Sequence, residues 1–305
     1  MAADSHTETR TKRDFGELAK DLILEVQTPN VRLVKKGQYA EAFEWLEAAD
    51  AAGLTPALTG PPGTGKTLLA TSFAQATGRP FEVMTMDDST RPAHLVGVHN
   101  PAQVLKGGYG WASFEAGPIA RMFASGGVFV ANELNRANEF VQNSFLEWLG
   151  ERTMYLPQLG RIRAHDDFFL VAAINPADMA GTHRMSEALK DRIRIWIQLD
   201  YPDPDVEMEI IKANVPGITL SEDFLNMAHR LVIATRDNRD IKTPASIRSA
   251  IAMVKIASEI GGKKKTLTPD QFKSIAMLVL PKGIDPKPGH TGEEIILKLI
   301  QGLGL

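Results

Sequence analysis

A glycine-rich loop at residues 60–67, GPPGTGKT, constrains the fold of this chain more than any other segment. It fits the pattern G-x-x-x-x-G-K-[ST], in which glycines let several backbone amides point inward and cradle phosphates. The helix that opens near Lys66 favours anions at its N-terminus, Lys66 can reach the β- and γ-phosphates, and the Thr67 hydroxyl can bind Mg²⁺. An apolar segment, LTPALT, precedes the loop and a helical pattern follows it, which is the context that the motif requires. The loop therefore predicts a nucleotide-binding site made by Gly60, Pro61, Pro62, Gly63, Thr64, Gly65, Lys66, Thr67 and Leu68.

Short apolar segments alternate with helical patterns as far as residue 203. LTPALT is the first strand-like segment, and the others are FEVMTM (81–86), GVFVA (127–131), FFLVAAI (168–174) and IRIWIQL (193–199). Alternating strands and helices predict a parallel sheet with helices on both faces. After YPDPD only helical patterns follow, at residues 206–214, 221–235, 244–260, 268–280 and 292–302. We therefore predict a disordered N-terminus over 1–14, an α/β nucleotide-binding core over 15–203 that starts with an amphipathic helix at 15–26, and an all-α C-terminal part over 204–305.

The bulk composition excludes several classes of protein. The 305 residues are 44% hydrophobic and 23% charged, which is typical of a globular protein, and the net charge of −3 gives no general attraction to nucleic acid. The chain has no cysteine, which rules out disulfides and thiolate metal sites, and His94, His99, His165 and His183 lack the spacing of metal ligands. The N-terminus has no apolar signal core and the run at 168–174 is too short to cross a bilayer, so we expect a soluble, cytoplasmic protein without a membrane span.

A polar pair, Asn132 and Glu133, follows the strand-like segment that ends in VFVA. A phosphate loop needs a neighbouring strand end that supports Mg²⁺ and polarises water. We predict that Glu133 activates or positions this water, and that Asn132 supports the metal through a water molecule. The alternative is a surface pair next to a helix over 137–150, for which Asn135 would be the N-cap.

Further polar residues lie near the ends of the last two strands. Asn175 follows FFLVAAI, at the carboxyl end of a strand, where ligands bind in open α/β sheets; the alternative is that it opens an Asn-Pro turn. Arg192 and Arg194 stand just before or in the last strand, and a guanidinium can stabilise charge on a transferred phosphoryl group. Arg248 is expected about two turns after the N-cap of a C-terminal helix.

In their order and spacing, GPPGTGKT, VFVANELNRA, AAINP and GTHRMSEALKDRI resemble the motifs of the AAA+ ATPases, and within them those of the MoxR-like group. The segment GVHNPAQVLKGGYGWASFEAGPI resembles the insertion in the second core helix of that group, at about residues 96–117. The resemblance extends over residues 30–260. It implies a P-loop NTPase (AAA+) core with a five-stranded parallel sheet, followed by a small all-α lid.

The resemblance also implies an activity. Members of the group are expected to form hexameric rings that bind ATP and Mg²⁺ at subunit interfaces, and to remodel or mature other proteins, often with a partner that has a von Willebrand A domain. The residues that would carry these roles are Lys66 and Thr67 for phosphate and Mg²⁺, Glu133 for water activation, Asn175 as the first sensor, Arg192 or alternatively Arg194 as the trans-acting arginine finger, and Arg248 as the second sensor.

One residue departs from the family pattern, because Asn132 stands where the pattern usually has Asp. An amide keeps an oxygen acceptor but lacks a charge next to a divalent cation, so we expect weaker Mg²⁺ binding and slower hydrolysis. The alternative, that Asn132 abolishes hydrolysis, describes a nucleotide-gated assembly protein. A nucleic-acid-translocating NTPase of restriction type is a further alternative, which the balanced charge disfavours. The choice of ATP over GTP follows from the resemblance alone.

The insertion is the expected place of contact with partner proteins. It combines Lys106, Tyr109 and Trp111 on a hairpin that contains two adjacent glycines; the alternative is that Trp111 and Phe114 only pack the hairpin onto the core. A second hairpin is predicted at 151–163 and could line a ring pore or bind nucleic acid through its arginines.

Overall fold

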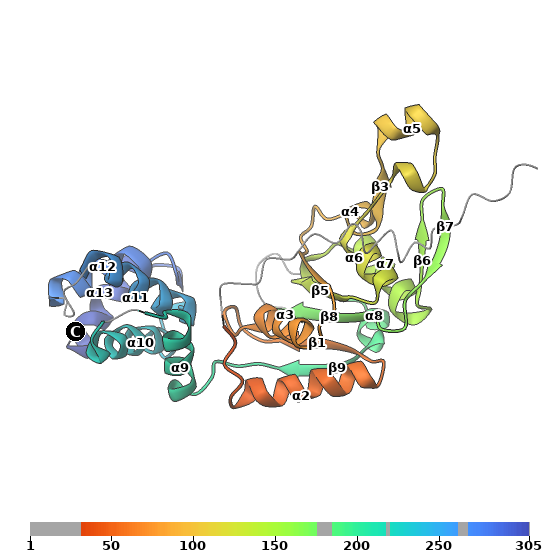
Figure 1. Ribbon diagram of the computed structural model, residues 1–305. Coiled ribbons are helices and arrows are strands. Elements are labelled where there is room, and N and C mark those ends of the chain that lie inside the picture. The colour runs from red at the N-terminus through yellow and green to blue at the C-terminus, as the bar shows by residue number, and fades with distance from the viewer. Residues whose placement is uncertain (1–31, 176–184, 218–219, 262–267, 305) are drawn as a thin grey trace, which may run out of the picture. The chain divides into compact units, whose positions relative to one another are not determined.

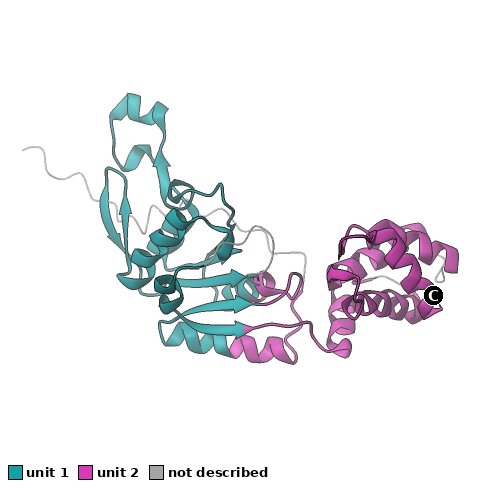
Figure 2. Cartoon of the chain, turned by 180° about the vertical axis from the view of Figure 1, so that it is seen from behind, with its two compact units in different colours: residues 1–28, 45–59, 70–197 teal, residues 29–44, 60–69, 198–305 magenta. Residues whose placement is uncertain are grey.

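The computed structural model describes residues 32–175, 185–217, 220–261 and 268–304 (Figure 1). The chain divides into two compact units (Figure 2). Unit 1 contains residues 1–28, 45–59 and 70–197, and unit 2 contains residues 29–44, 60–69 and 198–305. The predicted N-terminal segments and His183 lie outside the described residues, and the predicted domain boundary near residue 203 stays a prediction.

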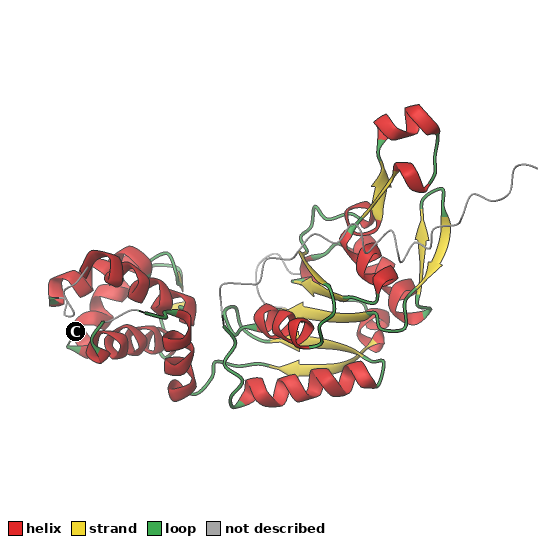
Figure 3. Cartoon of the chain, in the orientation of Figure 1, coloured by secondary structure: helices red, strands yellow, loops and turns green. Residues whose placement is uncertain are grey.

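Unit 1 is built around a five-stranded parallel sheet (Figure 3) with the strand order β2-β5-β8-β1-β9. Its strands are β1 (Thr55–Thr59), β2 (Phe81–Thr85), β5 (Val128–Asn132), β8 (Phe169–Ile174) and β9 (Ile193–Gln198). All of β8 and all but the last residue of β5 are buried. A strand buried on both faces has a continuous apolar sequence, which is why these strands could be recognised. The predicted α/β fold is confirmed.

Helices flank this sheet, and they are α2 (Gln38–Ala51), α3 (Lys66–Ala76), α4 (Pro92–Val96), α6 (Pro118–Ser125), α7 (Glu139–Gly150) and α8 (Glu187–Arg192). On one face, Phe123 of α6 and Phe145 of α7 share a buried cluster with Leu170 of β8. On the other face, Phe73 of α3 lies against Phe169 of β8, with ring centroids 5.4 Å apart. Because successive strand residues point to opposite faces, Leu170 and Phe169 face different helices. The sheet is therefore covered on both sides, as an all-parallel sheet requires.

Two small antiparallel strand pairs extend unit 1, and both are visible in Figure 3. They consist of β3 (Gly97–His99) and β4 (Phe114–Ala116), separated by α5 (Pro101–Gly107) and the 3₁₀ turn η1 (Trp111–Ser113), and of β6 (Thr153–Leu156) and β7 (Gly160–Arg163). The predicted hairpin at 151–163 is thus confirmed. His99 links the two pairs, because its Nε2 donates to the Pro157 carbonyl (2.8 Å) while its Nδ1 lies 2.9 Å from Ser113 Oγ.

The aromatic residues of the insertion divide into two groups. Phe114 is buried in the core of unit 1, whereas Trp111 is 40% and Tyr109 is 66% exposed. Packing onto the core therefore accounts for Phe114, and it leaves much of the Tyr109 and Trp111 surface open to solvent. That this segment is the second-helix insertion of the MoxR-like group stays a prediction.

Unit 2 contains the C-terminal helices, which are α9 (Pro204–Asn214), α10 (Glu222–Arg236), α11 (Ile247–Gly261), α12 (Pro269–Val279) and α13 (Gly292–Leu303). Side chains of Ser221, Thr268 and Thr291 cap three of these helices by accepting hydrogen bonds from backbone N–H groups. The expectation of helices alone is wrong in one detail, because β10 (Ile241–Thr243) pairs with β11 (Asp285–Pro286). Such short strands contain too few residues to show an alternating pattern. Among the described residues, no helix has the length and apolar character needed to cross a membrane.

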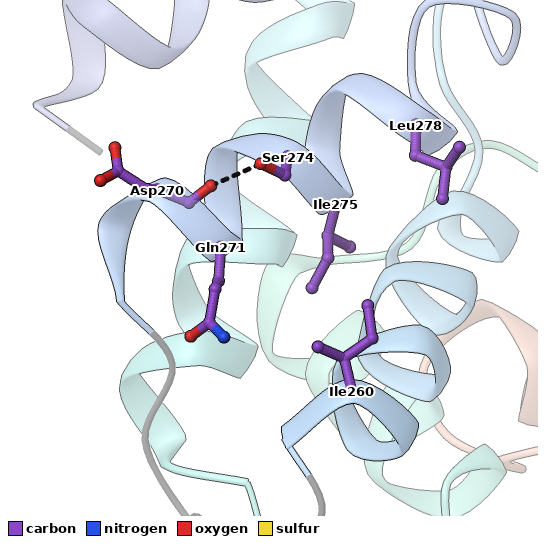
Figure 4. Close-up of a pocket in the computed structure, with 6 residues that line it drawn as sticks. All are labelled: Ile260, Asp270, Gln271, Ser274, Ile275 and Leu278. Atoms are coloured by element: carbon purple, nitrogen blue, oxygen red, sulfur yellow. Dashed lines mark hydrogen bonds between the residues drawn. The ribbon is translucent and has the colours of Figure 1, made fainter.

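An apolar groove of about 280 Å³ lies between α11 and α12 in unit 2 (Figure 4). Leu278 is 70% and Ile260 is 57% exposed along it. The Ser274 hydroxyl donates to the Asp270 carbonyl one turn earlier (2.8 Å), as Figure 4 shows. The groove is lined by Ile260, Asp270, Gln271, Ser274, Ile275 and Leu278. None of the predicted nucleotide or metal residues is among them, so the groove is not part of the candidate site.

Candidate nucleotide site

The phosphate loop has a backbone that only glycine adopts readily. Gly60, Gly63 and Gly65 have φ angles of 145°, 83° and 83°. Space is restricted as well, because a Cβ on Gly60 would lie 1.9 Å from the Leu199 carbonyl oxygen, and one on Gly63 would lie 2.3 Å from Ser246 Cβ. Backbone conformation and close packing therefore both require glycine at positions 60 and 63.

Hydrogen bonds within unit 2 fix the shape of this loop. The Tyr39 hydroxyl donates to the Thr64 carbonyl (3.0 Å), and Thr64 Oγ1 donates to the Pro61 carbonyl (2.9 Å). Lys66 Nζ donates to the carbonyls of Gly60 (2.7 Å) and Pro61 (2.8 Å). Because α3 begins at Lys66, the loop leads directly into a helix N-terminus. The loop thus combines glycine-containing turns, an ammonium group and a helix N-terminus, which are the features that bind phosphate.

Tyr39 lies outside the loop in the sequence but supports it through a hydrogen bond, a role that was not predicted. It is 3% exposed, and a Cβ on Gly65 would lie 3.6 Å from its ring. Burial raises the pKa of Tyr39 to about 12, and the nearby Glu207 carboxylate adds to this effect, so the hydroxyl keeps its proton and remains a donor. The two bonded residues are 25 positions apart, and no local pattern connects them.

Glu133 and Asn175 lie together just beyond neighbouring strands of unit 1. Glu133 Oε1 accepts a hydrogen bond from Asn175 Nδ2 (3.2 Å), and Glu133 Oε2 lies 2.8 Å from Arg136 Nε. Asn175 is 6% exposed, and its own carbonyl accepts from Asn135 Nδ2 (2.9 Å). Glu133 has φ 55° and ψ 41°, the left-handed conformation that is uncommon for a residue with a side chain. An uncommon backbone at a polar strand end is a feature often found at functional sites.

The sheet brings three strand ends to one edge. In the parallel register, Asn132 of β5 is opposite Ala173 of β8, and Ile174 of β8 is opposite Thr59 of β1. Gly60, the first residue of the phosphate loop, follows Thr59 directly in the chain. Ligands of open α/β sheets bind at this carboxyl edge.

Asn132 bonds to the neighbouring strand β2. Its Nδ2 donates to Thr85 Oγ1 (3.0 Å), the side chain of the last residue in β2. An aspartate at this position could not donate this bond, but the Thr85 hydroxyl could donate to the aspartate instead. Either side chain at position 132, an amide or a carboxylate, can therefore hydrogen-bond to Thr85. The two differ in the charge that they place at the end of β5.

The alternative interpretation of the segment as a helix cap is wrong for Asn135. Helix α7 begins at Glu139, and its N-cap is Asn138, whose side chain accepts from the Val141 N–H (3.2 Å). Asn135 is 2% exposed and belongs to the 3₁₀ turn η2 (Leu134–Arg136). Both positions hold Asn, and the preference of N-caps for Asn does not distinguish between them.

The family comparison agrees with this geometry. Residues 57–193 match the AAA domain (dynein-related subfamily). Residues 57–193 therefore form an AAA domain. The predicted resemblance is thereby confirmed at the level of the AAA+ fold.

Individual relatives, one of them a MoxR chaperone, are similar to parts of this chain. It is 28% identical to the gas vesicle ATPase GvpN of Ancylobacter aquaticus, over 65% of this chain and 59% of the relative. It is 32% identical to the chaperone MoxR1 of Mycobacterium tuberculosis, over 50% of this chain and 38% of the relative. The alignments therefore span less than two thirds of the length of these two proteins. The solved structure of NtrX from Brucella abortus in complex with ATP shares the fold, with a TM-score of 0.53 and 17% identity over 88% of this chain and 62% of that one.

The two candidate finger arginines of the AAA+ domain have different environments. Arg192 ends α8, and its guanidinium donates to the carbonyls of Leu146 (3.1 Å) and Ala188 (3.1 Å). Arg194 lies in β9 and pairs with the Asp191 carboxylate at 3.1 Å. Among the described residues, neither arginine bonds to Glu133 or Asn175. Arg192 is thus held in one orientation, whereas Arg194 is exposed and already paired with a carboxylate.

Arg248 lies closer to a helix start than the sequence indicated. It is the second residue of α11, which begins at Ile247, so the predicted position near a helix start is confirmed and only the distance of about two turns from the N-cap is wrong. Its side chain is exposed. Ser246, two residues earlier, occupies the space next to Gly63. The start of α11 therefore lies next to the phosphate loop within unit 2.

A buried ionic cluster stabilises unit 2 and was not predicted. The Glu207 carboxylate, on α9, is fully buried and receives hydrogen bonds from Arg236 (2.7 and 3.1 Å) and lies 2.9 Å from His229 Nε2. The Arg236 guanidinium also stacks on the Tyr201 ring, 4.0 Å from its centroid. Burial acts to raise the pKa of Glu207, but the hydrogen bonds from His229 and Arg236 outweigh it and hold the pKa below its ordinary value.

Proposed function

We propose that this AAA+ chain binds ATP with Mg²⁺ and hydrolyses it, and that hydrolysis drives the remodelling of a partner protein. The observation that carries the proposal is the pairing of Glu133 with Asn175 at the sheet edge from which the phosphate loop continues. A carboxylate and an amide in this arrangement can orient one water molecule between them.

In the proposed reaction, the water oxygen attacks the γ-phosphorus while the bond to the bridging oxygen breaks. The bonding electron pair leaves with ADP, and a water proton passes to Glu133 and then to the departing phosphate, so the products are ADP and inorganic phosphate. Asn175 would orient the water, and Lys66 would neutralise charge on the β- and γ-phosphates. Thr67, the second residue of α3, and the amide oxygen of Asn132, acting through water, would hold Mg²⁺. Bound Mg²⁺ supplies neutralisation of phosphate charge.

The reaction is tested by Glu133→Gln, which keeps the shape and the hydrogen-bond acceptor but cannot take up the proton. Loss of a positioned general base costs roughly 10²- to 10⁴-fold in turnover. We expect such a fall in kcat with ATP affinity unchanged, measured by phosphate release and by nucleotide titration. A Glu133→Gln protein as fast as its parent would leave a nucleotide-binding role alone.

We further propose a homo-oligomeric ring, hexameric as in the family, in which Arg192 acts on ATP bound by the neighbouring subunit. Its two carbonyl contacts hold the guanidinium in place, which favours it over the carboxylate-paired Arg194. Arg248, at the start of α11, would be the second sensor. Specific activity should rise with protein concentration through the assembly range. Activity per subunit that stays constant over this range would contradict a finger supplied in trans.

We propose that the remodelled client is a protein, that a partner with a von Willebrand A domain accompanies the chain, and that the chain acts in the cytoplasm. The names of the relatives, a chaperone and a gas vesicle ATPase, and the exposed Tyr109 and Trp111 support this class. The Glu133→Gln protein, loaded with ATP and purified from its host, should retain the partner for mass spectrometry. Co-purified nucleic acid in place of protein would support the translocase alternative.

A second candidate function is a nucleotide-gated assembly protein with little turnover. Asn132, with an amide in place of the usual charge, is the observation that favours it. Phosphate release at saturating Mg²⁺, measured for the parent and for Asn132→Asp, separates the two proposals. An assembly protein would hydrolyse ATP only after the Asn132→Asp substitution.

A further inference from the structure

The turn after β5 folds Arg136 back over Glu133. Glu133 adopts the left-handed conformation, and the Arg136 N–H then donates to the Glu133 carbonyl (2.8 Å). Between them, Leu134 and Asn135 are buried and anchor the turn, Asn135 through its bond to the Asn175 carbonyl. The Glu133 and Arg136 side chains are left 28% and 34% exposed. The turn is thus fixed by its two middle residues, and the charged pair is not required to hold it.

Both oxygens of the Glu133 carboxylate are occupied. Asn175 donates to Oε1, and Arg136 Nε lies 2.8 Å from Oε2. This Nε is buried, and it makes no well-aligned hydrogen bond to any of the described residues. The contact is therefore a Coulombic attraction without the directional component of an aligned hydrogen bond. A partly exposed ion pair of this kind is weak and readily exchanged.

We propose that Arg136 is a positioning residue that restrains Glu133, so that hydrolysis requires Oε2 to exchange Arg136 for the attacking water. The inference rests on the proposed ATPase function, in which Glu133 accepts the water proton. While Arg136 occupies Oε2, the guanidinium competes with water for the same oxygen. The Asn175 contact at Oε1 is retained in both arrangements, so only one oxygen has to change its partner.

The test compares Arg136→Gln and Arg136→Lys with the parent at saturating ATP and Mg²⁺. Loss of the guanidinium should raise kcat by about two- to fivefold, the factor by which a partly exposed ion pair biases an equilibrium, with the ATP Kd unchanged. Arg136→Lys keeps the charge and should retain the parental kcat. Lys190→Gln removes another i, i+3 ion pair of unit 1, with Glu187 (3.0 Å), and should change neither value.

The rise must depend on Glu133. Arg136→Gln combined with Glu133→Gln should be no faster than Glu133→Gln alone, and a rise in this double variant would overturn the proposal. An Arg136→Gln kcat equal to or below the parental value would also overturn it while leaving the ATPase proposal intact. A slow Glu133→Gln protein is required for the ATPase itself, so the two failures are distinguishable. Arg136→Met, which keeps the apolar stem, repeats the measurement if the Gln variant does not fold.

Discussion

Removal of one buried hydroxyl, in Tyr39→Phe, should weaken nucleotide binding without affecting the hydrolytic step. The hydroxyl donates to the Thr64 carbonyl at 3.0 Å, and Thr64 is fully buried. Phenylalanine keeps the ring, including the part that lies next to Gly65. The change is therefore confined to one hydrogen bond that holds the phosphate loop in shape.

The expected size follows from that bond. A buried hydrogen bond contributes about 0.5–1.5 kcal/mol net, and an acceptor left without a partner costs about 1–3 kcal/mol. If nucleotide binding must restore the loop shape, about 1 kcal/mol corresponds to an ATP Kd roughly fivefold higher. Because the pKa of Tyr39 is about 12, the parent keeps this donor throughout the neutral range, and the ratio of the two Kd values should not depend on pH between 6 and 9.

Calorimetric titration with ATP measures this effect, and phosphate release at saturating ATP measures kcat. Tyr155→Phe is the matched control, since it makes the same chemical change on β6 at a side chain that is 56% exposed. Only Tyr39→Phe should raise Kd. A lower melting temperature with an unchanged Kd would show that the hydroxyl stabilises the fold and does not shape the loop, and the reasoning would be refuted.

Two further predictions concern charge. Asn132→Asp should lower the Mg²⁺ concentration for half-maximal activity by roughly threefold to tenfold, because the new carboxylate lies near the cation and can still accept a hydrogen bond from Thr85. A magnesium titration of phosphate release measures this midpoint. An unchanged midpoint would contradict the prediction. The hydrogen bonds to Glu207 stabilise the protein fully above its ordinary pKa of 4.5, and this contribution is lost as the pH falls through the lower pKa of the folded state. Glu207→Gln should therefore be less stable at pH 7, by about 3–5 kcal/mol, and should show a flatter decline in melting temperature from pH 5 to 3. Parallel curves for the two proteins would oppose this assignment.

The sheet could be predicted because its central strands are buried on both faces. Segments such as FFLVAAI must then be apolar throughout, and the strand that forms, Phe169–Ile174, differs from the predicted range by one residue. The phosphate loop was equally visible, since its glycines are needed for φ angles and for space that no other residue allows. Features of this kind depend on short, contiguous segments of the sequence and can therefore be predicted from it.

Contacts that depend on a turn or on distant residues were not visible in the same way. The ion pair of Glu133 with Arg136 exists because Glu133 takes a left-handed conformation, which its residue type does not favour. Tyr39 reaches Thr64 only through the folding of unit 2. Asn135 was predicted as a helix cap because capping preferences depend on neighbouring residues in the sequence. The bond that Asn135 makes to the Asn175 carbonyl joins two strand ends that are far apart in the sequence. Sequence reasoning proposed chemical groups for the candidate site and missed the contacts that position them.

The charge of the β5 end connects the two unusual residues of this site, Asn132 and Arg136. From 132 to 136 the chain has one acid and one base, so this segment is neutral, and cation binding responds to such local charge. Asn132→Asp and Arg136→Gln each make the segment more negative by one charge, so both should lower the Mg²⁺ requirement. Only Arg136→Gln also frees Glu133, so it alone should raise kcat once Mg²⁺ is saturating. If Asn132→Asp raised the saturated kcat equally, local charge rather than restraint of Glu133 would limit turnover.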